Sequence, residues 1–252
     1  MRQLLPVPLA EVDPFVAHAH ADRPPHPDRP WMALNMVSST DGAISIAGRS
    51  GALGSDADRQ VFRAIRAVGD VIVAGGATVR AEGYGPPKPS ATVRAARVER
   101  GQAPYPRLAV VSGSLHLDEA SSFFTEAPEP PLVYTTATAP ADRLAVLRPV
   151  AEVVVVGDTS VDLAAMGAHL GSIGVRCAVV EGGGTLNGHL LADDLIDELN
   201  LTVAPLLVGG TAPRAVSSDQ EHPRRLGLAH LWESDGNLLA RYIRDDGDRS
   251  GA

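Results

Sequence analysis

Five short, valine-rich apolar runs recur along the chain and constrain its fold more than any other feature. They are residues 70–75, 107–112, 132–136, 153–157 and 175–183, most of them bounded by glycine or proline. Near-continuous apolar runs of this length are typical of strands covered on both faces. Helical patterns lie between them, notably at 141–147 and 161–173. Because strands and helices alternate, we predict an α/β fold with a mixed, mostly parallel sheet and helices on both faces.

Segments outside this series extend the predicted sheet. The apolar run at 31–37 ends at a polar Ser-Ser-Thr-Asp-Gly turn and predicts a buried strand. Ser55 and Asp58 resemble a capping box that opens an amphipathic helix ending near Gly69. Residues 198–207 predict a further strand, and the Asp-Gly turn within 226–244 predicts a C-terminal antiparallel hairpin.

The proline content divides the chain into three parts. Residues 21–30 contain four prolines, so we interpret residues 1–30 as an N-terminal arm with a proline-rich linker. Residues 31–245 are predicted to form one domain, followed by a flexible tail at 246–252. Within the domain, the polar, arginine-bearing segment 83–106 indicates a long loop or a mobile helix beside a site.

Composition excludes several classes of partner. The chain has 22 Lys and Arg against 30 Asp and Glu, a net charge of −8, and only 4% aromatic residues, which disfavours nucleic-acid binding. No apolar run suits a signal peptide or a membrane span. Cys177 is the single cysteine, so we expect no internal disulfide and a cytoplasmic location. We expect no metal site, because no acidic residues stand at the spacing of a metal-binding motif beside His18, His20 and His26.

Two glycine clusters follow predicted strands and precede helical segments. They are Gly75-Gly76-Ala77-Thr78 and Gly182-Gly183-Gly184-Thr185-Leu186-Asn187-Gly188. One interpretation is that free N–H groups at the start of the following helix bind a phosphate. The alternative is that the glycines only allow the positive φ angles of a tight turn. Phosphate binding is favoured for the second cluster, and both interpretations stay open for the first. Asn187 breaks the dinucleotide fingerprint G-x-G-x-x-G, and no P-loop motif occurs.

Two carboxylates, Asp41 and Glu181, stand beside predicted strand ends. There they can orient a polar substrate or transfer a proton, which makes both candidate catalytic residues. The alternatives are structural, with Asp41 stabilising its Asp-Gly turn and Glu181 capping a helix.

Three segments carry a family resemblance: residues 32–51, 61–82 and 179–210. The last contains Glu-Gly-Gly-Gly, Leu-Ile-Asp-Glu-Leu and Pro-Leu-Leu-Val-Gly-Gly, and is the most specific. Together they resemble the reductase domain of riboflavin biosynthesis, a relative of dihydrofolate reductase found in bifunctional deaminase-reductases and in stand-alone pyrimidine reductases. The similarity spans about residues 30–244. It implies a dihydrofolate-reductase-like fold.

The resemblance also implies an activity. NADPH would reduce 5-amino-6-(5-phosphoribosylamino)uracil to its ribitylamino product by hydride transfer to C1′. A reductase acting on a pterin or another heterocycle, and a non-catalytic NADPH-binding sensor, are the alternatives. The family, together with the apolar C-terminal strands, implies a homodimer.

Site residues transfer position by position. Substrate contacts are expected from Ser50, Arg66 and Glu181, although Arg66 alone would suggest a solvated charge near a helix C-terminus. Cofactor contacts are expected from the glycine clusters and their neighbours: Gly75, Gly76, Thr78, Glu82, Ser112, Gly182, Gly183, Gly184, Thr185, Leu186 and Asn187.

The chain departs from the family pattern at two places. Gly51-Ala52-Leu53 follows Ser50 where the bifunctional family has a tryptophan. Residues 82–87, Glu-Gly-Tyr-Gly-Pro-Pro, replace a loop that ends in a substrate-phosphate arginine, and Lys88 is the candidate replacement. The exact substrate therefore stays open. The zinc-deaminase motif is absent from the sequence.

Overall fold

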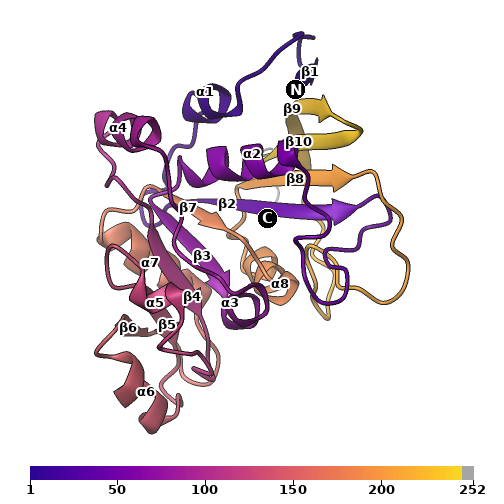
Figure 1. Ribbon diagram of the computed structural model, residues 1–252. Helices are drawn as coiled ribbons and strands as arrows, with labels where there is room; N and C mark the ends of the chain where they lie inside the picture. Colours follow the sequence, from indigo (N-terminus) through magenta and orange to yellow (C-terminus); the bar gives the residue numbers. More distant parts are fainter. Residues whose placement is uncertain (246–252) are drawn as a thin grey trace.

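The computed structural model describes residues 1–245, which form a ten-stranded sheet with helices on both faces (Figure 1). The strands run in this spatial order: β1 (Arg2–Leu5), β9 (Leu226–Ser234), β10 (Asn237–Arg244), β8 (Glu198–Ala204), β2 (Trp31–Ser39), β7 (Cys177–Val180), β3 (Val71–Gly75), β4 (Arg107–Val111), β5 (Leu132–Thr135) and β6 (Glu152–Val155). The helices are α1 (Pro14–Ala19), α2 (Asp56–Arg66), α3 (Gly76–Glu82), α4 (Ala91–Glu99), α5 (Ser122–Thr125), α6 (Ala141–Leu147), α7 (Leu163–Ser172) and α8 (Gly184–Ala192).

The sheet from β8 to β6 is parallel, and β10, β9 and β1 add antiparallel strands at one edge. The predicted mixed, mostly parallel sheet is therefore confirmed. The C-terminal hairpin is confirmed as well, and it turns at Asp235 and Gly236, which have φ values of 51° and 80°. These positive φ values suit the Asp-Gly sequence, because glycine has no Cβ to clash there.

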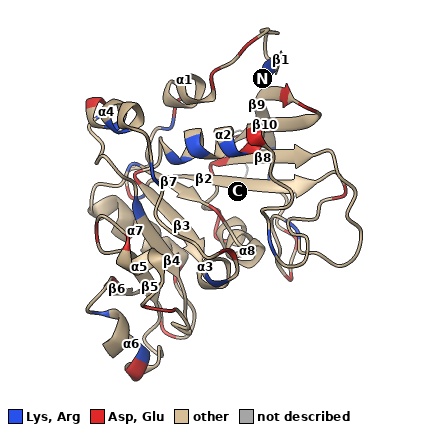
Figure 2. Cartoon of the chain, in the orientation of Figure 1, with Lys and Arg blue, Asp and Glu red and all other residues tan. Residues whose placement is uncertain are grey.

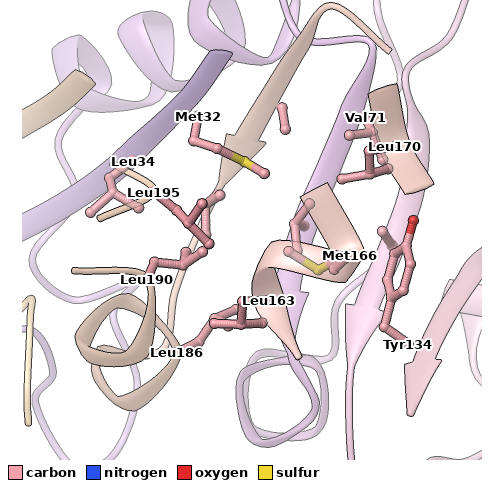
Figure 3. Close-up of a cluster of buried hydrophobic side chains, with 14 of the residues drawn as sticks. Met32, Leu34, Val71, Tyr134, Leu163, Met166, Leu170, Leu186, Leu190 and Leu195 are labelled. Carbon is pink, nitrogen blue, oxygen red and sulfur yellow. The ribbon is translucent and has the colours of Figure 1, made fainter. Parts of the chain in front are cut away.

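The parallel strands are apolar on both sides because helices cover both faces. On one face, α7 and α8 contribute Met166, Leu170, Leu186 and Leu190 to a core that contains Met32 (Figure 3). On the other face, α3, α5 and α6 cover β3, β4 and β5, while α2 packs over β7 and the antiparallel strands. Burial on both faces explains why these strands lack a polar alternation.

The N-terminal arm lies against the antiparallel edge of the sheet. β1 pairs with β9, and α1 packs beside α2. Further along the arm, Arg23 and Arg29 form ion pairs with Glu198 and Asp197. The division of the chain at residues 30 and 245 stays a prediction, and the predicted tail at 246–252 lies outside the described residues.

The structure tests two local predictions, the helix start at Ser55 and the segment 83–106. Ser55 is the N-cap of α2, and its side chain accepts from the Asp58 N–H, as the capping-box pattern predicts. The segment 83–106 contains α4 rather than a continuous loop, and Ser90 caps that helix. Among residues 1–245, no helix has the length and apolarity that crossing a bilayer requires.

The order of the strands in the sheet creates a binding position at the ends of β2, β7 and β3. β2 leads through α2 to β3, and β7 later inserts between these two strands. Loops that follow the three strands consequently meet at the same edge of the sheet. In α/β sheets, ligands bind at such a crossover, outside the carboxyl ends of the strands.

Candidate active site

A cavity of about 560 Å³ opens at the carboxyl ends of β2, β7 and β3. Its walls come from the end of β2, the loop around residues 44–54, one side of α2, the start and end of α3, and the start of α8. Seven predicted site residues line it: Ser50, Arg66, Thr78, Glu82, Glu181, Gly183 and Gly184. The fold thus brings together residues from three distant segments of the sequence.

One wall of this cavity carries a cluster of Arg66, Glu181 and Tyr84. The Arg66 Nε and Nη2 groups donate to the two Glu181 carboxylate oxygens at 2.7 and 2.6 Å. The Tyr84 hydroxyl donates to the same carboxylate. The Glu181 side chain is only 4% exposed and that of Arg66 14%, so this bidentate pair lies in a partly dehydrated wall.

Local structure explains the position of each partner. Glu181 directly follows β7, and its N–H donates to the Val73 carbonyl at 2.9 Å, which continues the pairing with β3. Arg66 is the last residue of α2, and its guanidinium lies over the Phe62 ring, 4.2 Å from the centroid. The helix therefore projects Arg66 over the end of β7, and the aromatic ring fixes its orientation.

The two glycine clusters meet at the wall formed by α3 and α8. The Gly75 N–H donates to the Gly182 carbonyl at 2.7 Å, and a Cβ at Gly183 would lie 3.1 Å from the Thr78 Oγ1. α8 begins after Gly183 without a side-chain cap, so its first amides are left for another acceptor. This close approach and the uncapped helix start fit the diphosphate of a nicotinamide dinucleotide.

Ser50 and Glu82 join two walls of the cavity. The Ser50 N–H donates to the Glu82 Oε1 at 2.8 Å. Glu82 is the last residue of α3, so this bond ties the loop that follows β2 to the end of that helix. Both residues border the cavity, so the contact holds the loop beside it.

Asp41 lies outside the residues that line the cavity, and its carboxylate contacts both its own turn and the loop at 205–210. Its carboxylate accepts from the Ser39 hydroxyl and from the N–H groups of Val208 and Gly209. Hydrogen bonds from Ser39, Gly209 and Val208 lower the pKa of Asp41 to about 2. A carboxyl group with this pKa is a poor proton donor at neutral pH, so these contacts favour a role in holding the 205–210 loop.

Other predicted cofactor residues stand around the cavity rather than in its wall. Leu186 is buried in the core, and Thr185 is exposed on α8. Asn187 is fully buried, and its Nδ2 donates to the Ala215 carbonyl at 2.7 Å. Ser112 accepts from the Leu115 N–H at 3.1 Å. Gly75, Gly76 and Gly182 shape the loops described above, and the binding role of each of these residues stays a prediction.

The structure adds residues that sequence reasoning did not assign to a site. Tyr84, Phe62, Asn35, Asp58 and Pro213 all border the cavity. The sequence indicates only a helix-cap role for Asp58, and burial raises the pKa of its carboxyl group. Tyr84 belongs to the loop that departs from the family pattern, and that departure was the only signal that pointed to it.

No group of three or more His, Cys, Asp or Glu side chains arranged to hold a metal ion occurs in the part of the chain that the structure describes. His26 contacts Asp197 at 2.9 Å, and His18 contacts the Arg23 Nη2 at 3.1 Å. These two histidines therefore take part in fixing the N-terminal arm.

Comparisons with known proteins agree with this geometry. A 2,5-diamino-6-ribosylamino-4(3H)-pyrimidinone 5′-phosphate reductase from Archaeoglobus fulgidus is 32% identical over 183 residues, covering 72% of this chain and 83% of that protein. The protein of the same name from Methanothermobacter thermautotrophicus is 31% identical, covering 85% of this chain and 98% of its own length.

Structural comparison gives the same result. The crystal structure of a pyrimidine reductase-like protein from Corynebacterium diphtheriae superimposes with a TM-score of 0.80 at 27% identity, covering 86% of this chain and 93% of the other. The expected dihydrofolate-reductase-like α/β fold is thereby confirmed. The family model of the RibD C-terminal domain matches residues 30–240. The chain therefore belongs to the RibD C-terminal domain family.

Proposed function

We propose that this protein reduces the ribosyl group of a phosphoribosylaminopyrimidine to a ribityl group in riboflavin biosynthesis, with NADPH as the reductant. The observation that carries the proposal is the Arg66–Glu181–Tyr84 cluster, which lies in one cavity with the glycine-rich starts of α3 and α8. A polar substrate and a dinucleotide can therefore meet there. Relatives named as pyrimidinone phosphate reductases support the same reaction class.

The first turns of α3 and α8 are proposed to hold the dinucleotide. Thr78, Gly183 and Gly184 line the cavity, and the missing Cβ at Gly183 leaves room for a phosphate beside Thr78. When bound, the nicotinamide supplies a hydride to C1′ of the opened ribosylamine. The preference for NADPH over NADH is part of this proposal.

Glu181 is proposed to orient the substrate. Its carboxylate is fixed by Arg66 and Tyr84 in the cavity wall and can accept hydrogen bonds from the substrate's amino groups. The protein thus aligns C1′ with the hydride donor, and a fixed geometry of this kind supplies a large part of the rate enhancement. Asp41 is proposed to act only through the loop that it holds.

Two pyrimidines are candidates for the substrate base. The family resemblance predicts the uracil form, whereas the relatives from Archaeoglobus and Methanothermobacter are named for the diaminopyrimidinone form. The deciding experiment measures NADPH oxidation with each compound and with dihydrofolate. Turnover of either ribosylaminopyrimidine phosphate supports the proposal. A higher kcat/KM for dihydrofolate favours the pterin alternative, and binding of NADPH without turnover of any of them favours the sensor.

A variant tests the cofactor cradle directly. Gly183→Val places a branched side chain against Thr78 and is expected to weaken NADPH binding by tenfold or more, on the order of 1.4 kcal/mol. Fluorescence titration measures the change. The matched control is Gly227→Val in β9, where the nearest atom to a Cβ is the Ile243 carbonyl oxygen at 3.9 Å. Unchanged affinity in the Gly183 variant would exclude this loop as the cradle.

We further propose a homodimer that is formed through the antiparallel part of the sheet. Leu238 pairs in register with Val203, and Leu228 with Tyr242, which places these side chains on one face. Leu228 and Leu238 are 41% and 39% exposed. A second copy would cover this apolar face. Sedimentation equilibrium tests the assembly, and a monomer at micromolar concentration would contradict it.

A cytoplasmic location remains part of the proposal. Cys177 is buried in β7, and burial raises the pKa of its thiol to about 12. Such a thiol is protected from oxidation and is compatible with a reducing compartment.

A further inference from the structure

The 206–217 segment, which follows β8, forms part of the wall of the candidate active site. Pro213 lines the cavity, and its carbonyl accepts from the Ile44 N–H at 3.2 Å. Ile44 belongs to the loop after β2, which also borders the cavity. The orange loop after β8 accordingly runs beside the purple loop after β2 (Figure 1). Contacts that hold this segment in place therefore also shape the cavity.

The first anchor of the segment is the turn at the end of β2. The Thr40 N–H donates to the Leu206 carbonyl at 2.9 Å, and the Thr40 hydroxyl donates to the same oxygen. The Asp41 carboxylate accepts from the N–H groups of Val208 and Gly209 at 3.1 and 2.7 Å. These bonds fix the start of the segment and leave its second half to another anchor.

The second anchor lies on α8, where two glycines leave room for the backbone of the segment. A Cβ at Gly184 would lie 2.5 Å from the Arg214 carbonyl oxygen. A Cβ at Gly188 would lie 2.6 Å from the Ser217 carbonyl carbon. Non-bonded atoms do not approach this closely, so a side chain at either glycine would displace the segment. The Ser217 N–H also donates to the Gly184 carbonyl at 3.0 Å.

Asn187 bonds the same part of the segment to α8. Its side chain is fully buried, and its Nδ2 donates to the Ala215 carbonyl at 2.7 Å. The same Nδ2 contacts the Met36 sulfur at 3.3 Å, and Met36 lines the cavity from β2. One amide group therefore contacts both the segment and a second residue of the cavity wall.

The three anchoring residues of α8 share one face of the helix. Gly184, Asn187 and Gly188 stand at positions i, i+3 and i+4, which are neighbours on a helix surface. The sequence of α8 contains no Lys, Arg, Asp or Glu, and the helix is tan in Figure 2. The segment is consequently held by close backbone packing and hydrogen bonds rather than by charge.

We propose that Asn187 and Gly188 are positioning residues, which hold the 206–217 segment on α8 and thereby set the position of Pro213 beside the cofactor cradle. Neither residue lines the cavity, so both act through the segment. The sequence predicts a direct cofactor contact for Asn187, whereas this proposal gives it an indirect role. The proposal rests on the proposed function, because it takes the start of α8 as the place where the dinucleotide binds.

Gly188→Ala is the central variant, because it adds one methyl group against Ser217 outside the cavity. Hydrogen–deuterium exchange of residues 206–217 measures how firmly the segment is held, and fluorescence titration measures NADPH affinity. Exchange in the segment should become about tenfold faster and NADPH binding about tenfold weaker, because the cavity wall moves. Within a helix, replacing glycine by alanine is otherwise favourable, so the helix itself does not explain such a loss.

Asn187→Ala tests the hydrogen bond to Ala215 separately and carries the test if Gly188→Ala does not fold. It should change exchange and affinity in the same direction. The matched control is Gly167→Ala in α7, where the nearest atom to a Cβ is the Arg29 Cβ at 3.5 Å, an ordinary contact. Its exchange and affinity should stay at the wild-type values. All titrations are made at a temperature where thermal unfolding shows each variant to be folded.

The two measurements separate a positioning role from a purely structural one. Faster exchange together with weaker NADPH binding supports the proposal. Faster exchange with wild-type affinity would overturn it, because the contacts would then stabilise the loop without affecting the site. Wild-type exchange in both variants would also overturn it. If the wild type does not bind NADPH, the proposed function fails, while exchange still decides whether these residues hold the segment.

Discussion

Two arginine–carboxylate clusters in this molecule have similar chemistry and different surroundings. Glu198 is 0% exposed and is paired with Arg23 and Arg241, while Trp31 and Asn200 donate to its remaining acceptor positions. Glu181 has one arginine and Tyr84, and it borders a cavity. We call these the sealed cluster and the open cluster. The first is enclosed by the protein, and the second leaves acceptor capacity for a ligand.

The sealed cluster joins three distant parts of the chain. Arg23 comes from the N-terminal arm, Glu198 from β8 and Arg241 from β10. Burial alone would raise the pKa of Glu198, but the charges and hydrogen bonds of Arg23 and Arg241 hold it well below its usual range. A buried carboxylate whose acceptor positions are all occupied by protein donors stabilises the tertiary structure. A carboxylate that keeps acceptor positions facing a cavity is suited to binding a ligand.

Removing the sealed carboxylate should have the largest effect. Glu198→Gln keeps the side-chain size but leaves two buried arginines without a negative partner, so the free energy of unfolding should fall by roughly 3–5 kcal/mol. Urea denaturation measures this loss. The control is Glu152→Gln, which breaks the exposed pair with Arg107 and should cost under about 1 kcal/mol. Equal losses in the two variants would show that burial does not distinguish these pairs.

Removing the open carboxylate should affect activity more than stability. Glu181→Gln retains the side-chain size but weakens the bonds to Arg66 and to the substrate, so kcat/KM should fall about 100-fold. Steady-state oxidation of NADPH measures this change, and urea denaturation should show a smaller loss than for Glu198→Gln. An unchanged kcat/KM would remove Glu181 from the proposed site and would leave both clusters with a structural role.

Low pH should decrease the free energy of unfolding because two buried histidines lie beside the sealed cluster. Burial lowers the pKa of His18 well below 6.5 and that of His230 to about 4, with help from Arg23 and Arg241. Both imidazoles are therefore neutral in the folded protein, while the unfolded chain binds protons below pH 6.5. Stability should consequently fall as the pH decreases from about 6.5 to 4, by at most about 1.4 kcal/mol per pH unit for each histidine.

The measurement compares urea unfolding of the wild type and His230→Phe across this pH range. His230 stacks on Trp232 with ring centroids 3.9 Å apart, and phenylalanine can keep that contact without titrating. The variant should lose less stability than the wild type between pH 6.5 and 4. If the free energy of unfolding falls equally with pH in both proteins, protonation of His230 does not contribute to the loss of stability.

Local patterns predicted most elements of the fold. The Val-rich runs became the parallel strands, the Ser55 signal marks the start of α2, and the Asp-Gly turn joins β9 to β10. The segment at 83–106 was harder, because its polar composition lacks an apolar stripe although it contains α4. There, Arg97 packs inward through hydrogen bonds to backbone carbonyls, a contact that composition does not reveal.

The sequence by itself determined which segments become strands and helices, because hydrophobic spacing acts over a few residues. It also determined that glycines and a carboxylate follow β7. Only the tertiary structure decided that Arg66 meets Glu181 across 115 residues and that Arg23 meets Glu198 across 175. These ion pairs depend on the order of the strands in the sheet. The spacing of apolar residues along the chain does not specify which strands become neighbours.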